Sequence, residues 1–80
     1  MITIKEVFSC ISKGLKVNIK KITINSSSKD FEQWDSLGHL DVMINLDKIL
    51  KGKALKLSNL SQAYSVKEII KILKSKKLLK

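Results

Sequence analysis

The middle of the chain holds the stretch WDSLGHLD, residues 34–41. Asp35 is a residue type favoured just before helices, because its carboxylate accepts a hydrogen bond from a backbone amide that the helix leaves free. We therefore predict a helix that begins at Ser36 and runs to about Leu50. Gly52 follows it at the position where a left-handed residue commonly ends a helix.

This predicted helix has two apolar faces when its residues are placed about 100° apart around the axis. The broader face is the natural core side and contains Val42, Met43, Leu46, Ile49 and Leu50. The other face lies roughly opposite and contains Leu37, Leu40 and Ile44. Asp41 flanks this second face on one side and Asp47 on the other. Either both faces are buried in a crowded bundle, or the second is an exposed strip that contacts a basic partner.

Two capping boxes predict the other main helices. The first is Thr3-Ile4-Lys5-Glu6, and it opens a predicted helix over residues 4–15 whose apolar face is Ile4, Val7, Phe8, Ile11 and Leu15. The second is Ser65-Val66-Lys67-Glu68, and it opens a last helix whose apolar face is Val66, Ile69, Ile70 and Leu73. Residues 58–63 predict one short helical turn, and we expect residues 74–80 to be frayed.

Residues 16–34 do not follow a helical period. Several β-branched residues in this segment resemble a short strand, but no other part of the chain offers a partner strand of similar quality. The run Ser26-Ser27-Ser28 predicts a turn. We expect an extended crossing segment that is pinned by its Ile residues, Phe31 and Trp34.

These elements predict one all-α domain over residues 1–80, a small bundle of three main helices with a short helix before the last. A chain of 80 residues is too short for a doubly wound nucleotide fold, a barrel or a second core. A single cysteine excludes an internal disulfide and a Cys-cluster zinc site, and no metal site is expected. The apolar runs are far too short for membrane insertion, and together with the single cysteine they indicate a cytoplasmic protein. We also expect the protein to be a monomer.

The charge is unevenly distributed along the chain. The chain has 16 Lys, no Arg and seven acidic residues, which give a formal net charge of +9. Residues 30–47 contain five acids and no Lys, whereas residues 1–29 carry +5 and residues 48–80 carry +9. A small basic module that binds nucleic acid is therefore the alternative function. Lysine lacks the bidentate fork with which arginine binds phosphate, so the acidic island is the more informative feature and a nucleic-acid partner is not expected.

At residues 34–41 the chain resembles the acyl carrier protein family, which includes the peptidyl carrier domains. The family signature is Asp-Ser-Leu at the start of the second helix, usually followed by an acidic residue near the position of Asp41. Here Asp35-Ser36-Leu37 lies near the middle of the chain, after a long loop, and opens an amphipathic helix. The resemblance covers nearly the whole chain, and further matches are Leu46, Asp47, Leu50 and Ser65-Val66.

The resemblance implies a four-helix bundle that is not an enzyme and has no catalytic residues. It implies that Ser36 carries 4′-phosphopantetheine, which a separate phosphopantetheinyl transferase takes from coenzyme A. The thiol of this arm would hold an acyl or aminoacyl group as a thioester, as in fatty acid biosynthesis, and present it to loading ligases, synthases and acyltransferases. We expect these partners to contact a set of residues around Ser36, namely Asp35, Leu37, Leu40, Asp41, Ile44 and Asp47.

The chain departs from the family in its charge and at one glycine. The family is typically acidic, whereas Lys48 and the basic connection over residues 51–56 stand here where acids are common. Gly38 also stands where an acid is frequent, and a glycine inside a helix costs up to about 1 kcal/mol. Because basic flanks repel partners built for acidic carriers, we expect a dedicated carrier of a specialised biosynthetic pathway.

The remaining chemically distinctive residues are His39, Trp34 and Cys10. Ser36, His39 and Asp35 include the residue types of a hydrolytic triad, but Asp35 is badly placed to orient the imidazole and no Gly-x-Ser-x-Gly elbow is present. We therefore expect His39 to be a surface residue near the prosthetic group. Trp34 is expected to anchor the loop against the bundle, and Cys10 to be a half-buried, unreactive thiol.

Overall fold

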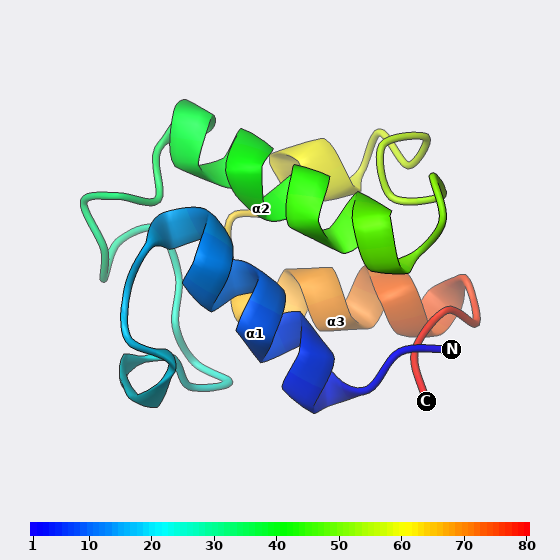
Figure 1. Cartoon of the computed structure of the whole chain (residues 1–80), viewed down its shortest axis with the longest axis horizontal. Helices are drawn as coiled ribbons and strands as arrows, with labels where there is room; N and C mark the ends of the chain where they lie inside the picture. The colour runs from blue at the N-terminus through cyan, green and yellow to red at the C-terminus, as the bar shows by residue number, and fades with distance from the viewer.

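Three α-helices form where capping residues precede apolar residues at helical spacing. In the computed structural model, which describes residues 1–80, they are α1 (Ile4–Leu15), α2 (Ser36–Ile49) and α3 (Val66–Ser75) (Figure 1). Two short 3-10 turns, η1 (Ile19–Lys21) and η2 (Leu60–Gln62), lie in the connections. The structure contains two isolated β-bridges and no strand, so the predicted all-α class is confirmed.

Each α-helix begins directly after the residue predicted to cap it. At α1, Thr3 Oγ1 accepts a hydrogen bond from the Glu6 amide at 3.2 Å, and the Glu6 carboxylate accepts one from the Thr3 amide at 2.9 Å. Asp35 caps α2 and Ser65 caps α3, each through a side-chain oxygen. The predicted bounds of α1 are confirmed, and the predicted end of α2 differs from the observed one by a single residue.

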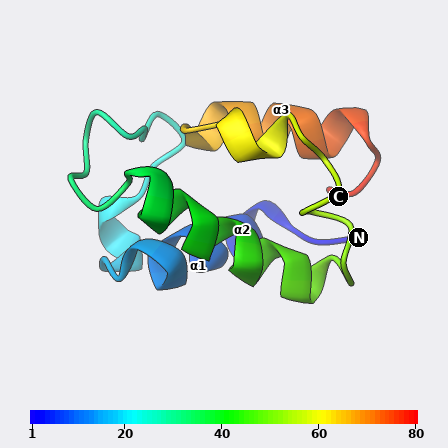
Figure 2. The same cartoon turned by 90° about the horizontal axis from the view of Figure 1, so that it is seen from above.

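The backbones of α1 and α2 approach closely where Gly14 lies at their crossing. A Cβ atom built on Gly14 would be 2.7 Å from the Cα atom of Val42, so any larger residue would push the helices apart. The two helices therefore lie side by side, as both views show, and α3 and η2 cover their other side (Figure 2).

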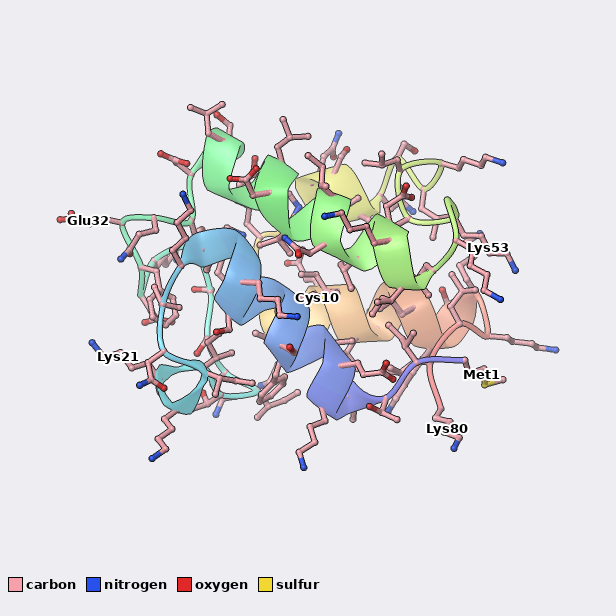
Figure 3. All side chains as sticks on the ribbon, viewed as in Figure 1. Met1, Cys10, Lys21, Glu32, Lys53 and Lys80 are labelled. Carbon is pink, nitrogen blue, oxygen red and sulfur yellow. The ribbon has the colours of Figure 1, made fainter.

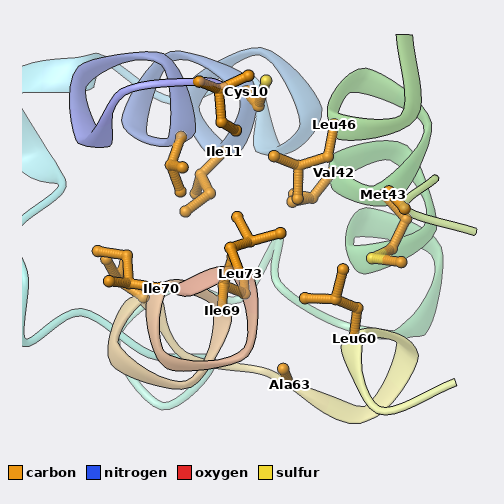
Figure 4. Packing of buried hydrophobic residues seen from close by; sticks show 14 of the residues in the cluster. Cys10, Ile11, Val42, Met43, Leu46, Leu60, Ala63, Ile69, Ile70 and Leu73 are labelled. Carbon is orange, nitrogen blue, oxygen red and sulfur yellow. The ribbon is translucent and has the colours of Figure 1, made fainter. Parts of the chain in front are cut away.

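The core lies between the three helices and η2, and it consists mainly of aliphatic side chains (Figure 4). Its completely buried members include Val7, Ile11, Val42, Leu46, Leu60, Ile69 and Leu73. Burial stabilises the fold by about 1.5–3 kcal/mol for each large side chain. The predicted core face of α2 is confirmed except at Ile49, which is 37% exposed because it lines a surface hollow beside Met1 and Lys51.

The segment between α1 and α2 is pinned at fewer points than predicted. Ile22 and Trp34 are buried and Phe31 is half-buried, but Ile19 and Ile24 are exposed. The predicted crossing segment is therefore correct in outline, and the prediction that its Ile residues pin it is confirmed only for Ile22.

Backbone hydrogen bonds tie this same segment to the start of α3. The Val66 amide donates to the Ser26 carbonyl at 3.0 Å, and the Ser28 amide donates to the Tyr64 carbonyl at 2.9 Å. These bonds join residues that are about forty positions apart in the chain, so no local sequence pattern could reveal them.

The C-terminal tail is ordered, and the prediction that it is frayed is wrong. Leu79 is buried, the Ile2 amide donates to the Leu78 carbonyl at 3.1 Å, and the Lys80 amide donates to the Ile2 carbonyl at 2.8 Å. Apolar side chains at Ile2 and Leu79 hold the tail against the core. The two ends of the chain consequently lie next to each other (Figure 1).

Candidate functional site

Ser36 is the first residue of α2, and its side chain is exposed. Asp35 Oδ1 accepts a hydrogen bond from the Gly38 amide at 2.8 Å, and the Asp35 carbonyl accepts one from the His39 amide at 2.8 Å. The amides of Ser36 and Leu37 precede these bonds and have no partner within the helix. Free amides and the positive end of the helix dipole stabilise an anion at such a position.

The second apolar face of α2 is exposed along its length. Leu37 is 73% exposed, Leu40 is 50% exposed and Ile44 is 39% exposed. We call these three residues the apolar strip. The interpretation in which both faces of α2 are buried is therefore wrong, and the strip begins directly beside Ser36. Exposed apolar side chains that gather on one face mark a contact surface.

The two carboxylates that flank the apolar strip differ in their surroundings. Asp41 is exposed and free to face an approaching partner. Asp47 is half-buried, and its Oδ1 atom accepts a hydrogen bond from the Leu55 amide at 3.0 Å. Asp47 thus holds the connection after α2 in place, a role that its position on the helix alone did not predict. Its contact with a partner stays a prediction.

A surface groove of about 380 Å³ lies between α2 and η2, next to the apolar strip. We call it the groove, and its lining residues are Ser36, Leu37, His39, Leu40, Met43, Leu55, Ser61 and Tyr64. Ser36 and two residues of the apolar strip are among the lining residues, so a group attached to Ser36 would start at the edge of this groove.

His39 is buried, with 2% of its surface exposed, so the prediction of a surface position is wrong. Its Nδ1 atom accepts a hydrogen bond from Trp34 Nε1 at 3.0 Å, and its Nε2 atom lies 2.7 Å from the Leu60 carbonyl oxygen. Since Nδ1 accepts, the proton of the neutral ring resides on Nε2, which donates to Leu60. The ring also stacks on Trp34 and on Tyr64, at centroid distances of 6.2 Å and 4.3 Å.

The burial of His39 has a signal in the sequence that the apolar pattern alone did not include. His39 precedes Val42, Met43 and Leu46 by three, four and seven positions, which places it on the core face of α2. Trp34, five residues earlier, supplies the donor that satisfies its ring. The prediction that Trp34 anchors the loop is confirmed, because its side chain is buried against the bundle.

Burial lowers the pKa of His39, because desolvation disfavours the imidazolium. The hydrogen bond to the Leu60 carbonyl opposes this shift but is the smaller effect. Both ring nitrogens are already engaged within the fold. The structure therefore does not place the His39 imidazole to act as a base on the Ser36 hydroxyl, as a hydrolytic triad would require.

The structure explains why position 38 holds glycine and not the acidic residue that is frequent in the resembling family. A Cβ atom built there would overlap the Gln33 carbonyl oxygen and lie 3.1 Å from Leu15 Cδ2. The loop before α2 thus passes so close to the helix that only glycine fits.

Cys10 is buried rather than half-buried, as a member of the core cluster. Burial is the main cause that raises the pKa of its thiol, and nearby Lys13 acts in the opposite direction. A raised pKa reduces the thiolate fraction, which is the reactive form.

Charged side chains lie at both ends of the molecule as well as along its helices (Figure 3). Lys21 and Glu32 lie at one end, and Lys53 and Lys80 lie at the other with Met1.

No group of three or more His, Cys, Asp or Glu side chains is placed to hold a metal ion. No helix has both the length and the apolar character that crossing a bilayer requires.

Comparison of the chain with protein-family models, with curated proteins and with solved structures finds no match. The resemblance to carrier proteins therefore stays a prediction that rests on the residues themselves.

Proposed function

We propose that this protein is an acyl carrier protein, which holds acyl or aminoacyl groups as thioesters on a 4′-phosphopantetheine arm esterified to Ser36. The observation that carries the proposal is the exposed Ser36 hydroxyl at the first residue of α2, directly beside the apolar strip. The short turn η2 supports a four-helix carrier arrangement, because it stands where the family has its short third helix.

The residues around Ser36 suit a phosphodiester. Its phosphate would lie at the helix N-terminus, where the free amides of Ser36 and Leu37 and the helix dipole stabilise negative charge. Asp35 holds the loop-to-helix geometry by capping α2 through the Gly38 amide at 2.8 Å. When bound, the arm supplies the thiol that carries the cargo. The chain itself needs no base near Ser36, because the transferase provides one.

The surface beside Ser36 suits recognition by the enzymes that load and use the cargo. The apolar strip supplies area that leaves water when a partner docks, and Asp41 attracts Lys or Arg on that partner. Long-range attraction raises the rate of encounter, and the strip gives the contact its orientation. The protein is in this proposal a substrate of its partners and catalyses no reaction.

Intact-mass measurement tests this function. The protein is incubated with coenzyme A, Mg²⁺ and a promiscuous phosphopantetheinyl transferase, and we expect one phosphopantetheine adduct per chain. Ser36→Ala is expected to remain unmodified. Ser61→Ala is the matched control, since Ser61 is an exposed serine that lines the same groove.

Two results would contradict the proposal. One is the absence of an adduct on the folded wild-type protein with every transferase offered. The other is an adduct that persists in Ser36→Ala. A basic module that binds nucleic acid would instead show affinity for polyanions that falls steeply with added salt and does not depend on Asp41.

A further inference from the structure

Three aromatic rings form a stacked row that reaches from the groove into the core, and the core residue Met43 lines the groove beside them. Trp34 comes from the loop before α2, His39 from the first turns of α2 and Tyr64 from the residues after η2. The His39 ring stacks on Trp34 on one side and on Tyr64 on the other. We call these three rings the aromatic layer. His39 and Tyr64 also line the groove, so the layer forms part of its floor.

Hydrogen bonds hold this layer closed. Trp34 Nε1 donates to His39 Nδ1 at 3.0 Å, and His39 Nε2 donates to the Leu60 carbonyl at 2.7 Å. No buried side-chain nitrogen or oxygen in the structure lacks a partner. A chain that entered the core beneath Ser36 would displace the His39 ring and leave an indole N–H and a carbonyl unpaired in an apolar interior.

The space beneath the aromatic layer is already filled. Val42, Leu46 and Leu60 have no exposed surface, and their side chains pack against α1 and α3 (Figure 4). The hollows of the molecule all open to solvent, so there is no internal cavity that an alkyl chain could occupy without repacking the core.

The groove itself covers a small group better than a long alkyl chain. Its walls include exposed Leu37, Leu40 and Leu55, but Ser36, Ser61 and Tyr64 place hydroxyl groups in the same lining. A long alkyl chain is stabilised only where its surface leaves water, and a chain that lay in this open groove would keep one side in solvent. A short acyl or aminoacyl group has little apolar surface to hide.

Building on the proposed carrier function, we infer that the cargo is a short acyl or aminoacyl group that stays outside the helical core. His39 is in this inference the specificity-determining residue, because it closes the core to long alkyl chains. The closure depends on the geometry of the aromatic layer, with its two hydrogen bonds and two stacked neighbours.

A chain-length series on the wild-type protein tests the inference. The transferase loads Ser36 from acetyl-, hexanoyl- and decanoyl-coenzyme A, and each adduct is verified by intact mass. We then measure the melting temperature, the emission of Trp34, which is the single tryptophan, and the rate at which hydroxylamine cleaves the thioester. We expect all three readouts to be the same for the acetyl and decanoyl forms.

A decanoyl chain that enters the core would raise the melting temperature by several degrees, shift the Trp34 emission and slow thioester cleavage by about tenfold or more. Any of these changes with an intact adduct would overturn the inference while leaving the carrier function in place. Absence of the adduct itself would overturn the carrier function, and the inference with it.

Two variants locate the effect at His39. His39→Leu replaces the imidazole by an apolar side chain of similar size and removes both ring hydrogen bonds, so the core can repack around an entering chain without breaking them. We therefore expect this variant to protect a decanoyl thioester and to leave an acetyl thioester exposed. Tyr64→Phe is the matched control, because it keeps the ring that stacks on His39 and should behave as the wild type. If His39→Leu does not fold, the wild-type series decides the question alone. A folded His39→Leu that leaves the decanoyl thioester exposed would contradict the role given to His39.

Discussion

At the scale of single residues, His39 makes the stability of the fold depend on pH. Burial lowers its pKa in the folded state, whereas the unfolded chain binds a proton near the ordinary value of about 6.5. The groups that face the ring are Trp34, Tyr64 and the Leu60 carbonyl, none of which is charged at neutral pH. The stabilisation is therefore complete above the unfolded pKa and is lost as the pH falls below it.

We expect the free energy of unfolding to decrease between about pH 7 and pH 5, with a slope of at most about 1.4 kcal/mol per pH unit. Urea unfolding followed by Trp34 emission measures it. His39 is the single histidine, so His39→Gln removes the only side chain of its type that titrates in this range and should flatten the profile. An unchanged slope in His39→Gln would assign the pH dependence to the carboxylates.

Gly38 gives a second prediction at this scale. Helix propensity alone favours Gly38→Ala by up to about 1 kcal/mol. The new Cβ atom would overlap the Gln33 carbonyl oxygen, however, and the loop would have to move. We expect a net loss of about 1–3 kcal/mol in the free energy of unfolding, measured by thermal or urea unfolding. Lys48→Ala, at an exposed position of the same helix, should change it by less than about 0.5 kcal/mol. A Gly38→Ala variant more stable than the wild type would show that the loop before α2 moves away from the new Cβ atom at little energetic cost.

At the scale of elements, the helices could be predicted because their signals are local. Thr3, Asp35 and Ser65 each satisfy amides within three residues of themselves, so a short stretch of sequence contains both partners. The segment between α1 and α2 could not be predicted to the same degree. Its position depends on bonds from Ser26 and Ser28 to the start of α3, which only the assembled fold brings within reach.

The candidate site also combines features that have a local signal in the sequence with features that depend on the assembled fold. The exposure of Leu37, Leu40 and Ile44 follows from the spacing of apolar residues around α2 and was predicted as one of two interpretations. The hydrogen bond of Asp47 to Leu55 depends on how the next connection folds back, so it had no local signal. The prediction of a surface position for His39 is wrong because it treats a polar side chain as one that faces solvent. A buried histidine is stable once both of its ring nitrogens are paired.

The exposed face of α2 gives a prediction for partner recognition. Asp41→Lys should lower kcat/KM for loading of Ser36 by about tenfold, because it replaces an attractive charge beside the strip with a repulsive one. The free energy of unfolding should stay within about 0.5 kcal/mol of the wild type, since the side chain is exposed. Glu68→Lys makes the same charge change on α3 and should leave kcat/KM unchanged. Equal losses in both variants would indicate a response to net charge alone.

At the scale of the whole molecule, the tail contributes to stability through a buried side chain. Leu79→Ala should reduce the free energy of unfolding by about 2–4 kcal/mol, because it removes a buried side chain beside the bridge to Ile2. Leu55→Ala is the matched control at an exposed leucine and should have little effect on unfolding. Urea unfolding of the two variants side by side gives the comparison. A loss no larger than that of Leu55→Ala would mean that the tail detaches readily in solution.

The pairing of Ile2 with Leu79 makes the polypeptide almost a closed ring. A linker of a few flexible residues would join the first and last positions without strain, and a new opening could be cut in the exposed connection after α2. Such a circular permutant would keep every helix intact. The same proximity would let the unit be inserted into a surface loop of a host protein, with both junctions on the side remote from the beginning of α2 (Figure 1).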